Sequence, residues 1–257
     1  MALVAAIYEQ VSLHPRYGYR MVTGALRRAG WQVNAKRVYR LWRREGLKVA
    51  RKAREHRAKG GSANSCVNRP AKHKDDVWAM DFIHDSTASG SSLKMLVIED
   101  EFTRECLALE VGGGRFGGER VAEVLTELLT IRGVPSGLRS DNGKEFTGAA
   151  VIGRLKAAGI EPLAVEAGCP WENGVVESLN SILRDELLNT EVFATVRTAR
   201  QMATAWRLEY NHRRPHGALG YLAPAEYAAR CQSAPGSAAL RPTRTGSGMN
   251  DTAMVLS

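Results

Sequence analysis

Three acidic residues stand where a carboxylate could hold a divalent cation: Asp81, Asp141 and Glu177. Asp81 lies in the apolar stretch WAMDF, Asp141 in LRSDNGKEF, and Glu177 in a segment with helical periodicity, with 35 residues between Asp141 and Glu177. Cations such as Mg²⁺ prefer carboxylate oxygens, and a pair of them can activate the attacking oxygen and stabilise the leaving oxygen in phosphoryl transfer. The three residues therefore predict a metal-binding catalytic triad, with Asp81 bridging two ions and the other two carboxylates flanking them.

A polar stripe follows Glu177 along its predicted helix. Asn180, Ser181 and Arg184 come three, four and seven residues after the glutamate, so all four share one face of an α-helix. An arginine there can neutralise a phosphate next to the reacting one. We predict that Asn180 and Arg184 contact DNA; an ordinary solvated helix face is the alternative for both.

Other candidate sites are weaker. The chain has no nucleophile elbow, P-loop or dinucleotide fingerprint, its histidines show no metal-ligand spacing, and its cysteines form no C-x-x-C pair,. We interpret Asp100, at the end of a predicted strand, as a turn-forming residue, and His216 as structural or DNA-facing. The acids that compete with the triad by position are Asp85, Glu99, Asp100, Glu145 and Glu172.

The pattern over residues 75–230 predicts an α/β domain. Strand-like segments at 77–85, 92–100 and 104–111 precede alternating helices and short strands,. The helices are expected around 121–129, 147–159, 170–188 and 195–214, and the later strands at 137–141 and 160–165. This order indicates a mixed sheet flanked by helices, similar to the ribonuclease H-like fold, with Asp81 on a central strand.

Basic charge is concentrated in residues 1–74, which hold 18 Lys and Arg against 3 Asp and Glu. Within residues 1–50, Asn34 is a good N-cap, and Gly30 and Gly46 are natural helix stops,. We predict a helix-turn-helix that binds DNA, with a helical hairpin that merely packs on the core as the alternative. Its predicted DNA contacts are Lys36, Arg37, Arg40, Arg43 and Arg44.

Two flanking segments lack periodicity. Residues 51–74 are expected to form a basic linker that can track phosphates, and residues 231–257, rich in small and polar residues, a disordered tail,. No apolar run reaches the ~18 residues that a membrane span needs, and the first ten residues contain Glu9 and no basic region, unlike a signal peptide,. We expect a cytoplasmic protein without a membrane partner.

Spaced blocks of the chain resemble bacterial insertion-sequence transposases, in particular the OrfB type of the IS-three family, which has a retroviral-integrase-like catalytic core. The resemblance covers about residues 14–230, with the blocks in the family's order. The blocks are YGYRMVTGALRRAGWQVNAKRVYRLWRREGL, VIEDEFTRECLALEV, SDNGKEFTG, PWENGVVESLNSILRDELL and YNHRRPHGALGYLAPAEY.

The resemblance implies a function in DNA transposition and integration. It implies strand cleavage by water and then strand transfer by the freed 3′-hydroxyl, with two Mg²⁺ or Mn²⁺ ions per site. Asp81, Asp141 and Glu177 take the catalytic positions and Arg184 the basic position, and Arg213 and Arg214 of the last block are expected to contact DNA. The implied partners are terminal inverted repeats, target DNA, further copies of the chain and an upstream-frame product, at the bacterial nucleoid.

Two other functions remain as alternatives. A plain metal-dependent nuclease would use the same fold and the same carboxylates. A DNA-binding protein without catalysis, such as a repressor of its own element, would use only the basic N-terminal segment.

Overall fold

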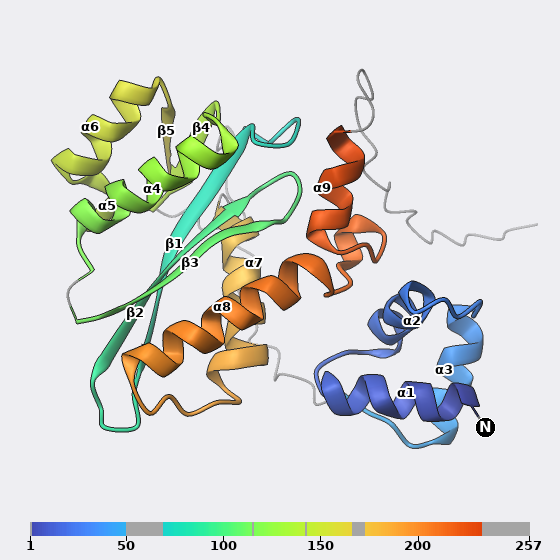
Figure 1. Ribbon diagram of the computed structural model, residues 1–257. Coiled ribbons are helices and arrows are strands. Elements are labelled where there is room, and N and C mark those ends of the chain that lie inside the picture. The colour runs from blue at the N-terminus through green and yellow to red at the C-terminus, as the bar shows by residue number, and fades with distance from the viewer. Residues whose placement is uncertain (1, 50–68, 115, 142, 166–172, 233–257) are drawn as a thin grey trace, which may run out of the picture.

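The computed structural model describes residues 2–49, 69–114, 116–141, 143–165 and 173–232 (Figure 1). The N-terminal helices are α1 (Ala2–Leu13), α2 (Tyr19–Arg28) and α3 (Ala35–Arg44). The strands are β1 (Val77–Ser86), β2 (Ser92–Asp100), β3 (Cys106–Gly113), β4 (Gly137–Ser140) and β5 (Glu161–Ala164). The remaining helical segments are α4 (Gly118–Arg132), α5 (Lys144–Thr147), α6 (Ala149–Ala158), α7 (Gly174–Leu183), the π-helical turn η2 (Arg184–Leu188), α8 (Val196–His212), the 3₁₀ turn η3 (Gly217–Leu219) and α9 (Pro224–Gln232).

The strands form one mixed sheet in the order β3-β2-β1-β4-β5. β1, β2 and β3 pair antiparallel, whereas β4 pairs parallel with both β1 and β5. β1 is therefore the central strand. The predicted mixed sheet flanked by helices, ribonuclease H-like in its order, is confirmed.

Alternate residues of β1 face two separate cores, as the two-residue period of a strand requires. Trp78 and Met80 pack with α4 and α6, and Ala79 and Ile83 pack with α7 and α8. Figure 1 shows these two helical layers on opposite sides of the sheet. Odd-numbered residues of this strand, Asp81 among them, thus lie on the α7 side.

Several predicted boundaries shift for local reasons. The strand expected from residue 104 begins at Cys106, because Arg104 sits in a turn with φ +62°. The helix expected over 147–159 is preceded by a separate short helix, α5, that ends before Gly148. The helix expected over 170–188 is described from Gly174, and its last turn changes from α to π geometry at Arg184.

The N-terminal helices pack around a core of their own, to which Ile7, Val22 and Val38 contribute. The expected caps are present. The side chain of Asn34 accepts a 2.9 Å hydrogen bond from the Lys36 amide, and Gly30 has φ +88°. Figure 1 places these helices beside the C-terminal end of α8 and near α9.

The predicted division into module, linker, core and tail remains a prediction. Most of the linker, residues 50–68, and most of the tail, residues 233–257, lie outside the described residues. None of the helices that the structure describes is long and apolar enough to cross a bilayer.

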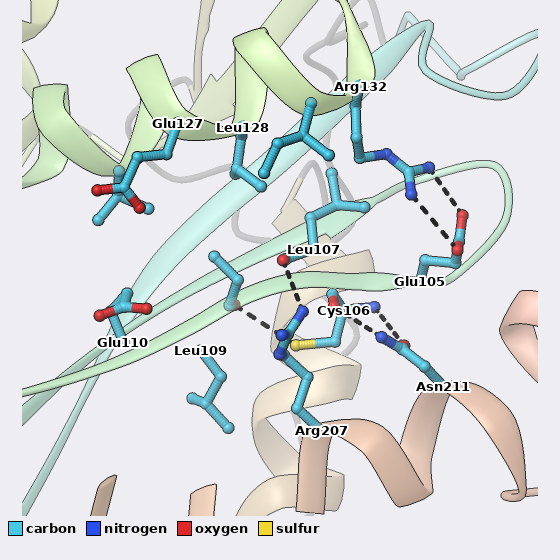
Figure 2. Close-up of a pocket in the computed structure, with 13 residues that line it drawn as sticks. Glu105, Cys106, Leu107, Leu109, Glu110, Glu127, Leu128, Arg132, Arg207 and Asn211 are labelled. Carbon is cyan, nitrogen blue, oxygen red and sulfur yellow. Dashed lines mark hydrogen bonds and ion pairs between the residues drawn. The ribbon is translucent and has the colours of Figure 1, made fainter. Parts of the chain in front are cut away.

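β3 is an edge strand, and side chains of α8 cover it (Figure 2). Arg207 donates to the carbonyl oxygen of Leu107 at 3.0 Å, and Asn211 both accepts from the amide and donates to the carbonyl of Cys106, each at 2.9 Å. These bonds occupy backbone groups that an added strand would need. A cavity of about 370 Å³ lies here between α4, β3 and α8, and none of the three predicted catalytic acids lines it.

Candidate active site

The sheet brings two of the predicted carboxylates level with each other. In the parallel pairing of β1 with β4, Ala79 lies beside Arg139. Two residues further along each chain come Asp81, still within β1, and Asp141, directly after the end of β4. Continuing the register therefore places these two residues side by side at the carboxyl end of β4.

The third carboxylate comes from α7, which packs on the face of β1 that carries Asp81. Val176, Leu179 and Leu183 are the buried residues of this helix. Glu177 and Asn180 lie one turn apart on another side of it, and both are half-buried. The Nδ2 atom of Asn180 donates a 2.7 Å hydrogen bond to Oδ2 of Asp81, which fixes the polar side of α7 against the strand.

The charges of Asp141 and Glu177 act on the carboxyl group of Asp81. Burial of the carboxyl group raises the pKa of Asp81 to about 6, and the negative charges of Asp141 and Glu177 raise it as well. The backbone amide of Phe82 and the side-chain amide of Asn180 oppose this shift, because hydrogen bonds to a carboxylate favour its ionised form,. A carboxyl group whose pKa is raised by neighbouring acids is typical of functional sites, including those in which carboxylates bind a cation.

The loop after Asp141 is fixed by a glycine and an ion pair. The amide of Gly143 donates to Oδ1 of Asp141 at 3.0 Å, and a Cβ on that glycine would lie 3.0 Å from the same oxygen. Glu145 forms an ion pair with Lys94 of β2, which lowers the pKa of Glu145. Lys94 is buried, with its ammonium nitrogen 4.0 Å from the centre of the Phe82 ring.

Sequence reasoning did not single out Lys94. The available signal was a lysine inside the otherwise apolar strand SLKMLVIED. A buried lysine at such a position requires an acidic partner, and the partly exposed Glu145 supplies it,.

Two of the other acids near the triad, Asp100 and Asp85, accept backbone hydrogen bonds, whereas Oε2 of Glu99 is buried without a hydrogen-bond partner among the described residues. Asp100 is fully buried and accepts backbone hydrogen bonds from Asp75, Phe102 and Thr103 at 2.6, 2.7 and 3.0 Å, which confirms it as a turn-forming residue. Asp85 accepts from the amide of the next residue at 2.8 Å. Glu99 is buried, and its burial raises its pKa well above the ordinary value. The fifth competitor, Glu172, lies outside the described residues.

Most of the predicted DNA contacts are exposed. Arg184 is exposed at the first residue of η2, and Arg213 has 77% of its side chain exposed. The amide of Asn180 is instead engaged with Asp81. The predicted DNA-contacting residues of α3 are all exposed to solvent: Lys36, Arg37, Arg40, Arg43 and Arg44.

The structure contradicts the expectation that Arg214 contacts DNA. Its side chain is buried, and its guanidinium pairs with Glu186 of η2 at 2.8 Å. It also lies 5.8 Å from the ring centres of Tyr17 and Tyr210. A guanidinium enclosed in this way joins the N-terminal module to the core and is not available to DNA.

The donor set suits a hard divalent cation, since all three carboxylates offer oxygen. Across the described residues, however, no group of three Asp, Glu, His or Cys side chains is close enough to hold an ion. Asp141 and Glu177 are nonetheless near enough for their charges to act on Asp81. Oδ1 of Asn180 is buried without a hydrogen-bond partner in the described part of the chain, which leaves an acceptor for a water beside Asp81.

Family models match three stretches of the chain. Residues 1–55 match a model described as an HTH-like domain. Residues 71–170 and residues 158–224 match two models that are each described as an integrase core domain.

Curated relatives come from bacterial insertion elements. An uncharacterised 31.7 kDa protein of insertion element IS407 from Burkholderia multivorans is 37% identical over 236 residues, covering 89% of this chain and 81% of the relative. Transposase InsD of insertion element IS2 from Escherichia coli is 30% identical over 234 residues, covering 86% of this chain and 76% of the relative.

A solved structure has a similar fold. A chain in the simian T-cell lymphotropic virus intasome, in complex with PP2A regulatory subunit B56 gamma, aligns with a TM-score of 0.53 and 13% identity. The alignment covers 98% of this chain and 80% of that chain. At this identity the likeness concerns the fold alone.

Proposed function

This chain belongs to the insertion-element transposases with an integrase core domain, which are polynucleotidyl transferases, and we propose that it cuts and joins DNA at the ends of such an element with Asp81, Asp141 and Glu177. One observation carries the proposal. The charges of Asp141 and Glu177 both act on the half-buried carboxyl group of Asp81 and help to raise its pKa to about 6. Asp81, Asp141 and Glu177 come from three separate segments of the chain, and the effect of the other two charges on Asp81 supports a shared site.

We propose that Asp81, Asp141 and Glu177 would hold two Mg²⁺ or Mn²⁺ ions. When bound, these cations would stabilise the charge on the attacking and leaving oxygens of the phosphodiester. Asn180 orients the Asp81 carboxylate through its 2.7 Å hydrogen bond.

The proposed reaction has two displacements at phosphorus. In cleavage, a water oxygen bonds to phosphorus and the bond from phosphorus to O3′ breaks, which leaves a 3′-hydroxyl and a 5′-phosphate. In joining, that 3′-hydroxyl oxygen bonds to a phosphorus of the target, and the displaced target O3′ takes up a proton. Arg184, exposed on η2 seven residues after Glu177, is placed to neutralise a neighbouring phosphate,.

DNA recognition falls to the N-terminal helices in this proposal. The HTH-like match and the exposed basic face of α3 support their contact with the terminal inverted repeats,. Joining two ends to a target requires both ends in one complex, so we propose that several copies assemble on DNA, with an upstream-frame product as a further partner. Such a complex would work at the nucleoid in the cytoplasm.

The decisive experiment is a strand-transfer assay. The full chain is incubated with labelled inverted-repeat duplex, unlabelled target and Mg²⁺, beside Asp141→Asn and Glu177→Gln. Asp85→Asn is the matched control, because it changes a carboxylate on the same strand as Asp81 that accepts a hydrogen bond from the amide of Ser86. Joined products are expected for the wild type and the control and should be lost in both triad variants.

The other outcomes identify the alternatives. Cleavage without joining under every condition would leave a metal-dependent nuclease. DNA binding without any product, in Mg²⁺ or Mn²⁺, would leave a non-catalytic regulator of the element and overturn the proposal.

A further inference from the structure

A cavity of about 520 Å³ lies between the N-terminal helices and the turn that follows η3. α2 contributes Arg20, Arg27 and Arg28 to its lining, and the turn contributes Tyr221. None of the residues that line the cavity is acidic. A concave site whose charged groups are all guanidinium ions is suited to an anion, and arginine forks match phosphate oxygens in particular.

One of the three arginines holds the two parts of the molecule together. Arg28 donates to the carbonyl oxygen of His212 at 2.6 Å and pairs with Glu226 of α9 at 3.0 Å. It also donates to the carbonyl oxygen of Arg213. Its donors are therefore committed to the contact between α2 and the C-terminal part of the core.

The other two arginines keep donors for a ligand. The Nε atom of Arg27 donates to the carbonyl oxygen of Val33 at 2.9 Å, and that of Arg20 to the hydroxyl of Tyr19 at 3.0 Å. Each bond fixes one edge of a guanidinium while the two terminal nitrogens carry the remaining donors. Both side chains are exposed towards the cavity mouth.

Tyr221 is held towards the cavity at a conformational cost. Its φ is +67°, in the left-handed region, where a bulky side chain is rare and strained,. The turn is closed by bonds from the Tyr221 amide to the carbonyl oxygen of His216 and from the His216 amide to that of Leu222, each 2.9 Å. A hydrogen bond with Tyr221, weaker than the one with Tyr19, contributes to raising the pKa of Arg20. The strained turn thus sets a tyrosine hydroxyl beside an arginine.

We propose that this cavity binds a phosphate of the DNA backbone, with Arg20 and Arg27 as its charged ligands and the Tyr221 hydroxyl as a further donor. The N-terminal module and the core would then bind one phosphate together. The inference rests on the proposed function for its ligand, DNA.

A substitution at Gly24 tests whether α2 and the core form the site together. A Cβ at this position of α2 would lie 3.0 Å from Cβ of Tyr221 and 3.1 Å from Cβ of Pro215. Gly24→Val should therefore push α2 away from the turn without changing any arginine of the sequence. If α2 alone formed the phosphate site, this substitution would leave DNA binding unchanged.

The test measures DNA affinity of the full chain against salt concentration. A random-sequence duplex is the probe, because a phosphate contact does not depend on sequence. Arg20→Gln with Arg27→Gln should reduce the slope of log affinity against log salt by about 1, the value for one phosphate. The matched control is Arg120→Gln with Lys156→Gln, which removes two charges from α4 and α6, on the other face of the sheet.

Two further variants separate the parts of the site. Gly24→Val should lose the same slope as the double arginine variant, and Tyr221→Phe should weaken binding about tenfold at an unchanged slope. Circular dichroism and thermal unfolding establish that each variant is folded; should Gly24→Val not fold, Tyr221→Phe still reports on the contribution of the core.

The inference is overturned if the double arginine variant keeps the slope of its control. A normal slope in folded Gly24→Val, together with unaltered binding by Tyr221→Phe, would also overturn it, because the core would then contribute nothing. The strand-transfer assay is independent of these readouts. A wild type that shows the slope effect but never cleaves or joins DNA contradicts the proposed function and leaves the phosphate site standing.

Discussion

The side-chain amide of Asn180 donates a 2.7 Å hydrogen bond to the carboxylate of Asp81, although 99 positions in the sequence separate them. This bond ties α7 to the central strand β1. Because α7 also carries Glu177, the bond sets the distance between two of the three acids. It also favours the ionised form of Asp81 against the effect of burial.

Asn180→Ala should lower the rate of strand joining by about 10–100-fold, the usual effect of removing a group that orients a metal ligand. The concentration of Mg²⁺ that gives half the maximal rate should rise as well, because the Asp81 carboxylate is no longer held. Ser181→Ala, which changes the exposed neighbour on the same helix, is the control. Equal rates and equal Mg²⁺ requirements for the two variants would show that Asn180 does not position Asp81.

The adjacent arginines at 213 and 214 should behave in opposite ways. Arg214→Met leaves the carboxylate of Glu186 partly buried without its partner, so the free energy of unfolding should fall by about 3–5 kcal/mol,. Arg213→Met changes an exposed side chain and should alter stability by no more than about 0.5 kcal/mol,. Urea unfolding of both variants measures the difference, and equal stabilities would refute the structural role of Arg214.

The buried pair of Arg139 and Glu101 allows a double-mutant cycle. Their Nε and Oε1 atoms lie 2.6 Å apart, and both side chains are about 5% exposed or less. Arg139→Met should destabilise the fold by about 3–5 kcal/mol, because it leaves a buried carboxylate unpaired. Adding Glu101→Leu should recover most of that loss. A double variant as unstable as the sum of the single variants would mean that the two groups do not interact.

Stability should depend on pH through His216. Burial lowers its pKa to about 4, and the positive charges of Arg214 and Arg104 act in the same direction. The unfolded chain has the ordinary histidine pKa of about 6.5. The folded state therefore keeps its full stability above about pH 6.5 and loses up to about 3 kcal/mol as the pH falls towards 4.

His216→Gln removes this titration. Urea unfolding of both proteins at several pH values should show a smaller loss of stability for the variant between about pH 6.5 and 4. Parallel curves for wild type and variant would exclude His216 as the cause.

Local sequence signals were sufficient for much of the fold. Asn34 predicted a helix start because its side chain can cap the backbone amide of Lys36, and it does so,. The apolar stretch that leads to Asp81 predicted a strand, and the order of elements predicted that this strand is central. The mutual placement of the three acids was predicted from strand order and helix period, and it stays a prediction.

Features that depend on distant partners could not be predicted in this way. From the sequence, Arg214 is expected to be a surface charge. In the structure, Glu186 and Tyr17, from two other parts of the chain, enclose it. Lys94 needs Glu145, 51 residues away, to explain its burial. The π-helical turn at Arg184 has no short-range signature, because its wider hydrogen-bond ring depends on how α7 packs,.

The central position of β1 has a consequence for how the chain is made. Synthesis runs from the N-terminus, so the basic helices come first, β1 next, and its parallel neighbour β4 only after β2, β3 and α4. α7 and its glutamate are added last of the proposed catalytic parts. Any translation product that stops before Gly174 lacks Glu177 and carries the basic helices without a complete triad. Under the proposed function, premature termination would then give a product that competes for the element's ends and cannot cut DNA. The late position of Glu177 in the chain would thus prevent incomplete products from acting as nucleases.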